Sequence, residues 1–431
     1  MKIINVGLIG LGTVGCGVVK VFEKKSEILQ KKLGIKLVLK RICDIDLTRP
    51  RDVNIDSNIL TSDVNQLLED DQIQIIIELI GGIHPAKSYV VRALKNKKYV
   101  VTANKALLAE AGEEIFNIAR ENAVDVYFEA SVGGGIPIIK ALKEGFVANQ
   151  VEGIFGIING TSNYILTQMS QKGCEFKIAL TEAQKKGYAE KDPTLDIDGL
   201  DSAHKIAILA QLCFNQSIQT KDVFVEGIRD IDLSDIRYAD ELGFCVKLLA
   251  IAKKNGNELQ LRVHPTLLSK RSLLAKINGV YNAILINADL VGECLFYGQG
   301  AGQAPTASAV MSDIVCVAMN ISGEILADKN IPEIKNSTEK ISSIDDLETR
   351  YYMRFAALDE PAVLSSIATI LGKFGISIHS VIQKGRRQEQ AVPIVMMTHE
   401  AKENNLKKAL VEIDQLPVIK RKTVVIRVER N

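Results

Sequence analysis

The chain has 431 residues, and at the usual domain size this length corresponds to about three domains. Lys and Arg together number 53 and Asp and Glu 52, so the net charge of +1 offers no broad basic surface to a nucleic acid. Hydrophobic residues at 47% and charged residues at 24% are ordinary for a globular protein and exclude an intrinsically disordered or fibrous chain.

The cysteines are odd in number and widely spaced, and no two of them form a C-x-x-C pair. This spacing excludes a disulfide framework and a zinc site, and it indicates a reducing, cytoplasmic environment. The N-terminal residues could be read as a signal peptide, but the glycines from Gly7 to Gly17 interrupt the apolar stretch. Since no apolar run reaches the ~18 residues of a membrane span, we expect neither a leader nor membrane association.

Apolar runs alternate with amphipathic helical stretches through roughly the first 130 residues. The run at 73–80 is mostly apolar, as expected for a strand that is buried on both faces. The alternation predicts a parallel, doubly wound sheet. The predicted strands are 3–9, 35–42, 73–80, 99–102 and 124–129, and the predicted helices are 13–33, 85–96 and 106–121.

Further elements follow the predicted sheet. Residues 136–312 mix helices, such as 200–212, with alternating strands, such as 259–263, and indicate an α+β layer. Residues 321–349 are polar and predict a linker. From Arg350 onward the pattern predicts a βαββαβ unit of about 80 residues. Its strands are expected to begin at 350, 376, 391 and 423, and its helices span 361–374 and 400–413.

A glycine-rich segment lies between the first predicted strand and the first predicted helix. Its residues, Gly10, Leu11, Gly12, Thr13, Val14 and Gly15, fit G-x-G-x-x-G. The three glycines permit a tight turn, close approach of a pyrophosphate and close helix–strand packing, while the helix N-terminus offers free N–H groups. We therefore predict dinucleotide binding rather than a simple turn.

Asp44 is the candidate ligand for the cofactor ribose. It lies 29 residues after Gly15, at the end of the second predicted strand, and the long first helix explains this distance. An acid there accepts a hydrogen bond from the ribose 2′-hydroxyl of NAD and repels the 2′-phosphate of NADP, so we favour NAD. Arg41, Arg49 and Arg51 are near enough in sequence to accommodate NADP, and turn formation alone could also explain Asp44.

The segment from Gly187 to Lys205 contains five carboxylates within 12 residues. Asp201 and Lys205 are spaced i,i+4 on the predicted helix, so they share one of its faces. One interpretation is a capped helix with a structural salt bridge. The other is an acidic pocket for an ammonium group, in which Lys205 stays protonated and donates a proton to a developing alkoxide.

Three further segments hold candidate polar groups. Lys105 follows a predicted strand at the carboxyl edge of the sheet, where open α/β sheets bind ligands. Glu129 precedes a glycine-rich bend whose clustered oxygens suit a hard cation, although a simple change of chain direction explains it equally well. The turn 159–164 could hold a substrate carboxylate, and the glycine-rich turn 298–306 could cover the cofactor.

Taken together, these motifs resemble homoserine dehydrogenase. The resemblance runs from the first strand to about Ser312 and is most specific over Gly187 to Lys205. The C-terminal βαββαβ unit resembles an ACT domain, a regulatory module that binds small ligands. The implied reaction is the reduction of L-aspartate 4-semialdehyde to L-homoserine by NAD(P)H. Because the chain begins at the first strand of the cofactor fold, we expect no fused aspartate kinase.

The resemblance also implies roles for individual residues. Lys205 would be the acid and base, and Lys105 would assist near the nicotinamide. The substrate residues would be Glu190, Asp196, Asp201, Gly160, Thr161 and Tyr188. Gly187 and Gly302 would join the glycine-rich loop, Asp44 and Lys105 in binding the cofactor. A sodium ion would be held by Glu129 and by backbone oxygens of Val132, Gly134 and Ile136.

The implied domains are a Rossmann domain (1–135), a catalytic and dimerisation domain (136–320), a linker (321–349) and an ACT domain (350–431). A helix at about 304–320 would pack back on the Rossmann domain. We expect a homodimer or a larger homo-oligomer, with L-threonine or another amino acid at the ACT domain.

Two departures from the family pattern bear on ligand choice. Cys43 stands near a position that is basic in many relatives, which leaves NAD or NADP open. Ala362 stands where ACT domains carry glycine after Asp359-Glu360-Pro361, which puts threonine binding in question. Two other interpretations of the chain are a 2-hydroxy-acid dehydrogenase with an ACT tail and a non-catalytic amino-acid sensor. The first leaves the Gly187–Lys205 segment unexplained, and the second needs neither lysine.

Overall fold

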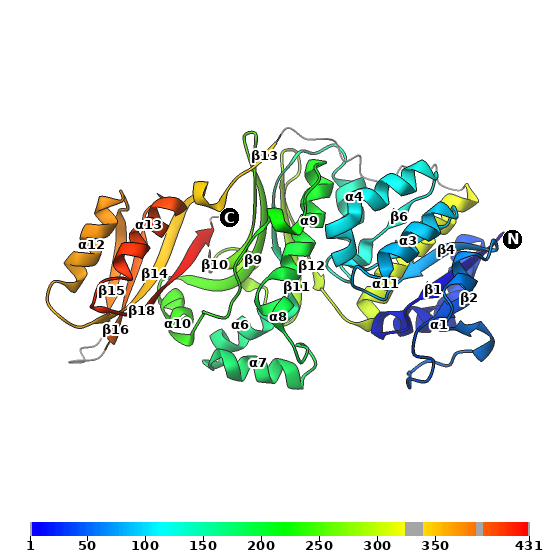
Figure 1. The fold of residues 1–431 in the computed structure, drawn as a ribbon, viewed down its shortest axis with the longest axis horizontal. Coiled ribbons are helices and arrows are strands. Elements are labelled where there is room, and N and C mark those ends of the chain that lie inside the picture. Colours follow the sequence, from blue (N-terminus) through cyan, green and yellow to red (C-terminus); the bar gives the residue numbers. More distant parts are fainter. Residues whose placement is uncertain (1, 324–338, 385–390, 430–431) are drawn as a thin grey trace. The chain divides into compact units, whose positions relative to one another are not determined.

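A computed structural model gives the fold, and it describes residues 2–323, 339–384 and 391–429 (Figure 1). The chain divides into two compact units, each assembled from three separate segments. The first unit comprises Met1–Ile154, His204–Asp222 and Asn282–Thr338, and the second comprises Phe155–Ala203, Val223–Tyr281 and Glu339–Asn431. The domain limits drawn from the sequence therefore stay predictions.

The first unit is built on a six-stranded parallel sheet, as the alternating pattern predicts. Its strands lie in the order β3-β2-β1-β4-β5-β6, which is the order of a doubly wound dinucleotide-binding sheet. The central strands β4 and β5 are mostly buried, as expected where helices cover both faces of a sheet. The strands are β1 (Lys2–Ile9), β2 (Ile35–Cys43), β3 (Leu60–Thr61), β4 (Ile73–Glu78), β5 (Tyr99–Thr102) and β6 (Val126–Tyr127).

Three helices of this sheet begin and end close to the predicted residues, namely α1 (Thr13–Leu33), α3 (Ala86–Lys95) and α4 (Lys105–Glu121). The short helix α2 (Asn65–Leu68) was not predicted. The predicted strand 124–129 is too long, because the chain leaves the extended conformation at Phe128 and Glu129 begins a 3-10 turn, η2 (Glu129–Ser131). Glu129 therefore lies beyond the strand. The unit also contains α5 (Ile138–Lys140), a π-helical turn at Ala141–Gly145, and a 3-10 turn, η1 (Ser57–Ile59).

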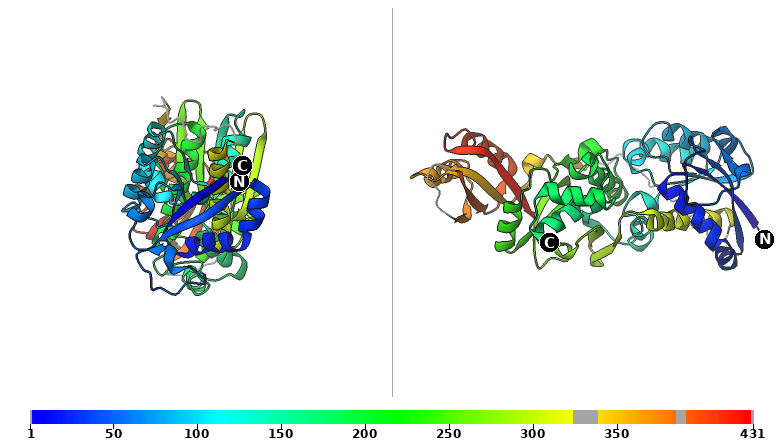
Figure 2. Two further views of the ribbon diagram at one scale, coloured as in Figure 1. Left: turned by 90° about the vertical axis from the view of Figure 1, so that its right-hand side faces the viewer. Right: turned by 90° about the horizontal axis from the view of Figure 1, so that it is seen from below.

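Helix α11 (Gln303–Ser322) joins the core of the parallel sheet although it lies far along the chain. Its buried residues Ala307, Val310 and Ile314 share one hydrophobic cluster with Val6 and Leu8 of β1. Figure 2 shows α11 beside α1. Among the described residues, α11 alone is long and apolar enough to cross a membrane, but half of its most apolar window is buried in the protein, so this match is weak evidence for a span.

The second unit contains a long antiparallel hairpin of β9 (Phe244–Asn255) and β10 (Glu258–Ser269). Beside it lie β7 (Val151–Ile157) and β8 (Phe224–Val225). The helices of this unit are α6 (Gly160–Lys172), α7 (Phe176–Lys185), α8 (Thr194–Ile197) and α10 (Leu233–Glu241). Strand β7 crosses the limit between the two units, as do α9 (Leu200–Phe214) and β11 (Tyr281–Ala288), whereas β12 (Gly292–Gln299) belongs to the first unit. Short 3-10 turns occur at Thr220–Asp222 and Leu274–Lys276.

The C-terminal part of the second unit has the predicted βαββαβ order. It consists of β14 (Glu348–Leu358), α12 (Val363–Lys373), β15 (Ile378–Gln383), β16 (Ala391–Thr398), α13 (Glu403–Ile413) and β18 (Ile419–Glu429). An unpredicted two-residue strand, β17 (Ala401–Lys402), precedes α13. The strand order β18-β14-β16-β15 is that of a ferredoxin-like sheet, and residues of α12 and α13 share its hydrophobic core.

The predicted linker 321–349 is partly structured. Helix α11 extends to Ser322, and residues 324–338 lie outside the described residues. After them, β13 (Lys340–Ile341) pairs with β10, and a 3-10 turn at Ile344–Asp346 precedes β14. The polar composition therefore did not exclude regular structure, because two backbone pairings suffice for so short a strand.

Candidate functional site

The glycine-rich loop connects β1 to α1, and its three glycines face different surroundings. Gly10 has a φ of +98°, and a Cβ on it would lie 2.7 Å from the carbonyl carbon of Leu79. A Cβ on Gly15 would lie 2.2 Å from the Gly10 oxygen, so helix and strand can approach only without a side chain there. A Cβ on Gly12 would meet no atom within 4 Å, so this side of the loop is open.

The N-terminus of α1 begins at this open glycine. Gly12 is the N-cap, no side chain caps the helix, and its first turn contains no acid. Its backbone N–H groups and the positive end of its dipole are therefore available to an anion. The geometry of this loop suits a pyrophosphate, and contact of Gly10, Leu11, Gly12, Thr13, Val14 and Gly15 with the cofactor stays a prediction.

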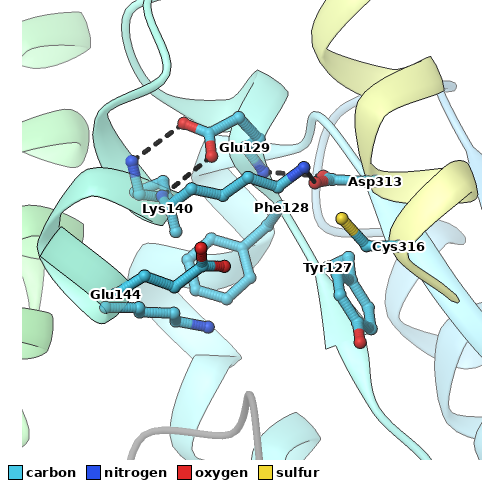
Figure 3. Close-up of a pocket in the computed structure, with 9 residues that line it drawn as sticks. Tyr127, Phe128, Glu129, Lys140, Glu144, Asp313 and Cys316 are labelled. Atoms are coloured by element: carbon cyan, nitrogen blue, oxygen red, sulfur yellow. Dashed lines mark hydrogen bonds and ion pairs between the residues drawn. The ribbon is translucent and has the colours of Figure 1, made fainter. Parts of the chain in front are cut away.

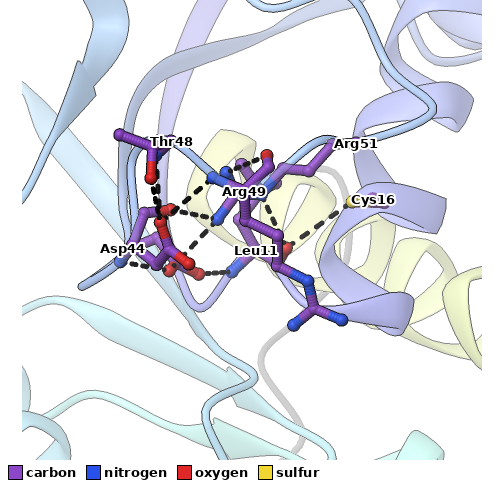
Figure 4. A network of polar contacts seen from close by, with 7 residues as sticks. Leu11, Cys16, Asp44, Thr48, Arg49 and Arg51 are labelled. Carbon is purple, nitrogen blue, oxygen red and sulfur yellow. Dashed lines mark hydrogen bonds and ion pairs between the residues drawn. The ribbon is translucent and has the colours of Figure 1, made fainter.

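Asp44 lies directly beside the loop, with Arg51 against it (Figure 4). The Leu11 N–H donates to Asp44 Oδ2 at 2.6 Å, and Arg51 Nη2 lies 3.2 Å from Asp44 Oδ1. Arg51 Nε donates to the Leu11 oxygen at 3.1 Å. The structure thus brings together the acid and one of the three arginines that bear on the choice of cofactor.

Glu78 holds the segment that precedes Lys105, and sequence reasoning missed it. Its buried carboxylate accepts hydrogen bonds from Thr102 Oγ1 at 2.7 Å and from the Ile80 N–H at 2.9 Å. Burial raises the pKa of the Glu78 carboxyl. Asn104 then caps α4 by accepting the Leu107 N–H at 3.1 Å, and α4 begins at Lys105. The available signal was a charged residue at the end of an otherwise apolar strand.

The turn at Glu129 is buried and tightly hydrogen-bonded (Figure 3). Glu129 Oε1 accepts the Ile139 N–H at 2.8 Å and Oε2 accepts the Lys140 N–H at 2.9 Å, so the carboxylate caps α5. Burial raises the pKa of the Glu129 carboxyl. Its own N–H donates to Asp313 Oδ2 on α11 at 2.8 Å. Asp313 is therefore a second residue that sequence reasoning missed, since its partner lies 184 positions away.

The carboxylate of Glu129 and the backbone oxygens of Val132, Gly134 and Ile136 are the ligands that we predicted for a sodium ion. Gly133 and Gly134 have φ angles of +72° and +56°, which bends the chain between Val132 and Ile136. One carboxylate with backbone carbonyls is a hard-oxygen set that suits sodium. Both Glu129 oxygens keep a lone pair beyond their N–H partners, and the Ile136 oxygen already accepts the Ile138 N–H at 2.8 Å. These oxygens could therefore hold a cation. A simple change of chain direction explains the bend at 132–136 equally well.

The second glycine-rich turn lies against the first unit's own loops. A Cβ on Gly134 would lie 2.5 Å from the Gly300 oxygen, and one on Gly17 of α1 would lie 2.8 Å from the Gln303 oxygen. Gly302 has a φ of +123° and is the N-cap of α11. The turn therefore packs beside α1, and its covering of a cofactor stays a prediction.

In the second unit, Asn159 connects the acidic segment to α6. Its Nδ2 donates to Asp196 Oδ1 at 2.7 Å and to Asp201 Oδ2 at 2.9 Å, while its Oδ1 accepts the Ser162 N–H at 2.8 Å. One buried amide thus caps α6 and fixes two carboxylates. Sequence reasoning singled out the turn that contains Asn159, but only the fold shows this connecting role.

Gly160 begins α6, and Thr161 Oγ1 donates to the Tyr188 oxygen at 2.6 Å. Tyr188 is 44% exposed, and its ring meets Tyr164 edge-on with centroids 5.0 Å apart. Gly187 has a φ of +73°, which allows the chain to turn before Tyr188. Glu190 is exposed.

The five carboxylates of the acidic segment do not converge. Asp192 caps the turn at Thr194, with Oδ1 to Thr194 Oγ1 at 2.6 Å, and Asp198 pairs with Arg229. Asp196 and Asp201 are the two that meet, at Asn159. Asp201 and Lys205 are both buried and lie one turn apart on α9, as the i,i+4 spacing predicts.

Comparisons with known proteins connect these features. Residues 137–315 match the family described as homoserine dehydrogenase, and residues 10–129 match the homoserine dehydrogenase NAD binding domain. A homoserine dehydrogenase of Synechocystis sp. is 45% identical, with 99% of each chain covered, and one of Neisseria gonorrhoeae is 42% identical over 100% of this chain and 99% of that protein.

The chain belongs to the homoserine dehydrogenase family. A solved homoserine dehydrogenase from Thiobacillus denitrificans is 42% identical, with a TM-score of 0.92, and the match covers 100% of this chain and 99% of that one. A hyperthermophilic archaeal homoserine dehydrogenase in complex with NADPH is 27% identical, with a TM-score of 0.62 over 75% of this chain and 99% of that one. Homoserine dehydrogenases are NAD(P)-dependent oxidoreductases that interconvert L-aspartate 4-semialdehyde and L-homoserine. The alternatives of a 2-hydroxy-acid dehydrogenase and of a non-catalytic sensor are thereby set aside.

Proposed function

We propose that Lys205 is the acid that protonates the carbonyl oxygen of L-aspartate 4-semialdehyde, and that Lys105 assists it. The nicotinamide, when bound, supplies the hydride, so the protein needs only to bind, orient and protonate. The observation that carries the proposal is the convergence of Asp196 and Asp201 on Asn159, one helical turn from Lys205. As an ammonium group, Lys205 would donate the proton that the developing alkoxide needs.

The remaining substrate groups follow from the polar surfaces near Asn159. Asp196 and Asp201, with Glu190, would bind the substrate ammonium, while Gly160, Thr161 and Tyr188 would contact its carboxylate end. Support comes from the hydrogen bond of Thr161 to the Tyr188 backbone and from the exposed position of Glu190. For the cofactor, the open side of Gly12 would receive the pyrophosphate, with Lys105, Gly187 and Gly302 contributing as the resemblance implies.

The decisive assay follows NAD(P)H oxidation with L-aspartate 4-semialdehyde. Replacement of Lys205 by Ala should lower kcat by ~10²–10⁴, the usual size of a general-acid effect, while KM changes little. Lys191→Ala, in the same acidic segment, is the matched control and should leave kcat close to that of the wild type. Full activity of Lys205→Ala would refute the assignment and would leave Lys105 as the candidate donor.

We propose NAD as the preferred cofactor. Asp44 has a carboxylate beside the loop and would accept the ribose 2′-hydroxyl, but Arg51 lies against it and would stabilise a 2′-phosphate. Values of kcat/KM with NADH and NADPH measure the preference. Asp44→Ala should shift the preference toward NADPH, and Arg51→Ala should shift it toward NADH. If the ratio of the two kcat/KM values is unchanged in both variants, neither residue contacts the cofactor ribose or its 2′-phosphate.

We propose sodium at Glu129, Val132, Gly134 and Ile136, on the basis of the hard-oxygen set described above. The metal would hold the bend 132–136 in place and take no part in the chemistry. If it binds, NaCl should raise the melting temperature more than choline chloride at equal ionic strength. Glu129→Gln should remove the difference, and an equal response to both salts would contradict a specific site.

The C-terminal ferredoxin-like unit is proposed to be an ACT domain that binds L-threonine or another amino acid, in an enzyme of threonine, methionine and isoleucine biosynthesis. Its element and strand order support this assignment. We also propose a homodimer or a larger homo-oligomer, as the family resemblance implies. A cytoplasmic location is proposed as well, and the seven free cysteines support it. Sedimentation with and without threonine tests the oligomer and the ligand together. The absence of any effect of millimolar threonine on activity or melting temperature would argue against regulation by threonine.

A further inference from the structure

The second unit contains a cavity of about 180 Å³ that takes no part in the site described above. It lies among α6, α10, the beginning of β9 and the segment that follows β10. Its lining combines apolar side chains, including Leu166, Ile236 and Phe244, with polar ones, including Thr167 and Asn278. A cavity of mixed character and this volume suits a small organic molecule with one polar end.

One of the residues that line this cavity, Lys247, has a buried side chain. Lys247 is 3% exposed, and its Nζ donates to Asn163 Oδ1 at 3.1 Å, to Asn278 Oδ1 at 3.2 Å and to the Ile277 oxygen. All three acceptors are neutral, and among the ion pairs of the described residues none includes Lys247. A buried charge without a counterion is costly, so an anion that entered here would be strongly stabilised.

The other ionisable groups of the cavity do not neutralise Lys247. Asp240 and Lys270 form an ion pair of 2.6 Å between Oδ1 and Nζ, and both side chains are about half exposed. Burial raises the pKa of the Cys245 thiol, which stays neutral. The net charge around the cavity is therefore +1, from Lys247 alone.

We propose that this cavity binds a small monocarboxylate, whose carboxylate pairs with the Lys247 ammonium and whose apolar body contacts Leu166, Ile236 and Phe244. The binding would exchange one neutral acceptor of Lys247 for a charged one, which forms the stronger hydrogen bond. The site itself does not depend on the proposed roles of Lys105 and Lys205.

The protonation of Lys247 supplies a distinctive readout. Burial lowers the pKa of its ammonium group to about 8, so a carboxylate that binds beside it will raise this pKa. Binding near pH 8 should therefore take up protons. Calorimetry of the full-length protein with isobutyrate, in two buffers of different ionisation enthalpy, measures this uptake directly.

The expected result is saturable binding of isobutyrate with a Kd of about 1 mM or tighter, accompanied by proton uptake. Isobutyramide has the same shape without the charge and should bind at least ~10-fold more weakly. Lys247→Met should lose the binding. Lys253→Met, on the same strand but about half exposed, is the matched control and should retain it.

Each remaining outcome counts against the proposal. Equal affinity for isobutyrate and isobutyramide, binding without proton uptake, or no saturable binding by the wild type would overturn it. Binding that persists in Lys247→Met would place the carboxylate elsewhere. If Lys247→Met does not fold, Ala275→Met fills the cavity while Lys247 stays in place, and undiminished isobutyrate binding by this variant would be equally decisive.

Discussion

The carboxylate of Asp313 on α11 accepts the backbone N–H of Glu129 at 2.8 Å and thereby anchors a turn that lies 184 positions earlier in the chain. Asp313 is 1% exposed, and Lys140 Nζ lies 3.5 Å from its Oδ1. The pairing explains why a carboxylate is tolerated inside a helix that packs in the core. It also makes the turn at Glu129 dependent on the ionisation of Asp313.

Asp313 predicts a specific dependence of stability on pH. Burial outweighs the attraction of Lys140 and raises the pKa of the Asp313 carboxyl to about 7, so between about pH 4 and 7 the folded state holds a proton that the unfolded chain has lost. The contribution of this group to stability is complete below pH 4 and is lost as the pH rises through 7. Asp313→Asn, which cannot ionise, should show a smaller loss of unfolding free energy over this range. Denaturant titrations at several pH values measure this loss. If the pH profile of the variant equals that of the wild type, the raised pKa of Asp313 would be contradicted.

Asn159 should affect both stability and substrate binding. Asn159→Ala removes an α6 cap, at a cost of ~1 kcal/mol, and releases Asp196 and Asp201 from their shared amide. We expect a lower melting temperature together with a KM for L-homoserine that rises several-fold. Asp56→Ala removes the cap of the short turn η1 and serves as the control, with KM unchanged. A variant of Asn159 with normal KM would show that the amide is purely structural.

Gly12 and Gly15 should respond differently to alanine, although they belong to one motif. A Cβ on Gly15 meets the Gly10 oxygen at 2.2 Å, so Gly15→Ala should destabilise the folded protein by more than ~1 kcal/mol. A Cβ on Gly12 meets nothing, so Gly12→Ala should keep its melting temperature but bind NAD(P)H more weakly. Thermal unfolding and NAD(P)H fluorescence titrations separate the two effects. Equal loss of stability in both variants would contradict this division of roles.

Ala362 is an alanine in a backbone conformation that favours glycine. It is the N-cap of α12 and has a φ of +73°. Since this conformation costs a non-glycine residue roughly 1–2 kcal/mol, Ala362→Gly should stabilise the protein by about 1 kcal/mol. Ala368→Gly, within α12, should instead destabilise it by about the same amount. Denaturant unfolding of the two variants provides the comparison. If Ala362→Gly is less stable than the wild type, Ala362 is not strained in its positive-φ conformation.

Hydropathy patterns predicted the long elements of the parallel sheet and of the βαββαβ unit in order, and missed only the short β3, α2 and β17. Both patterns arise from short-range alternation, which each segment carries within itself. The glycine loop and the Asp201–Lys205 spacing were readable for the same reason, because they are local motifs. The limits of the strand at 124–129 were not, since Phe128 leaves the extended conformation in response to its packing.

The residue order alone did not predict contacts between residues that are distant in the chain. Nothing local marks Asp313 as the acceptor for Glu129, Asn159 as the group that joins Asp196 to Asp201, or Lys247 as a buried ammonium beside a cavity. The sequence determined which residue types are present and which helix or strand they occupy. Three-dimensional packing determined which of the five carboxylates meet and which charges lose their water, because desolvation and hydrogen-bond geometry depend on segments that are distant in the chain.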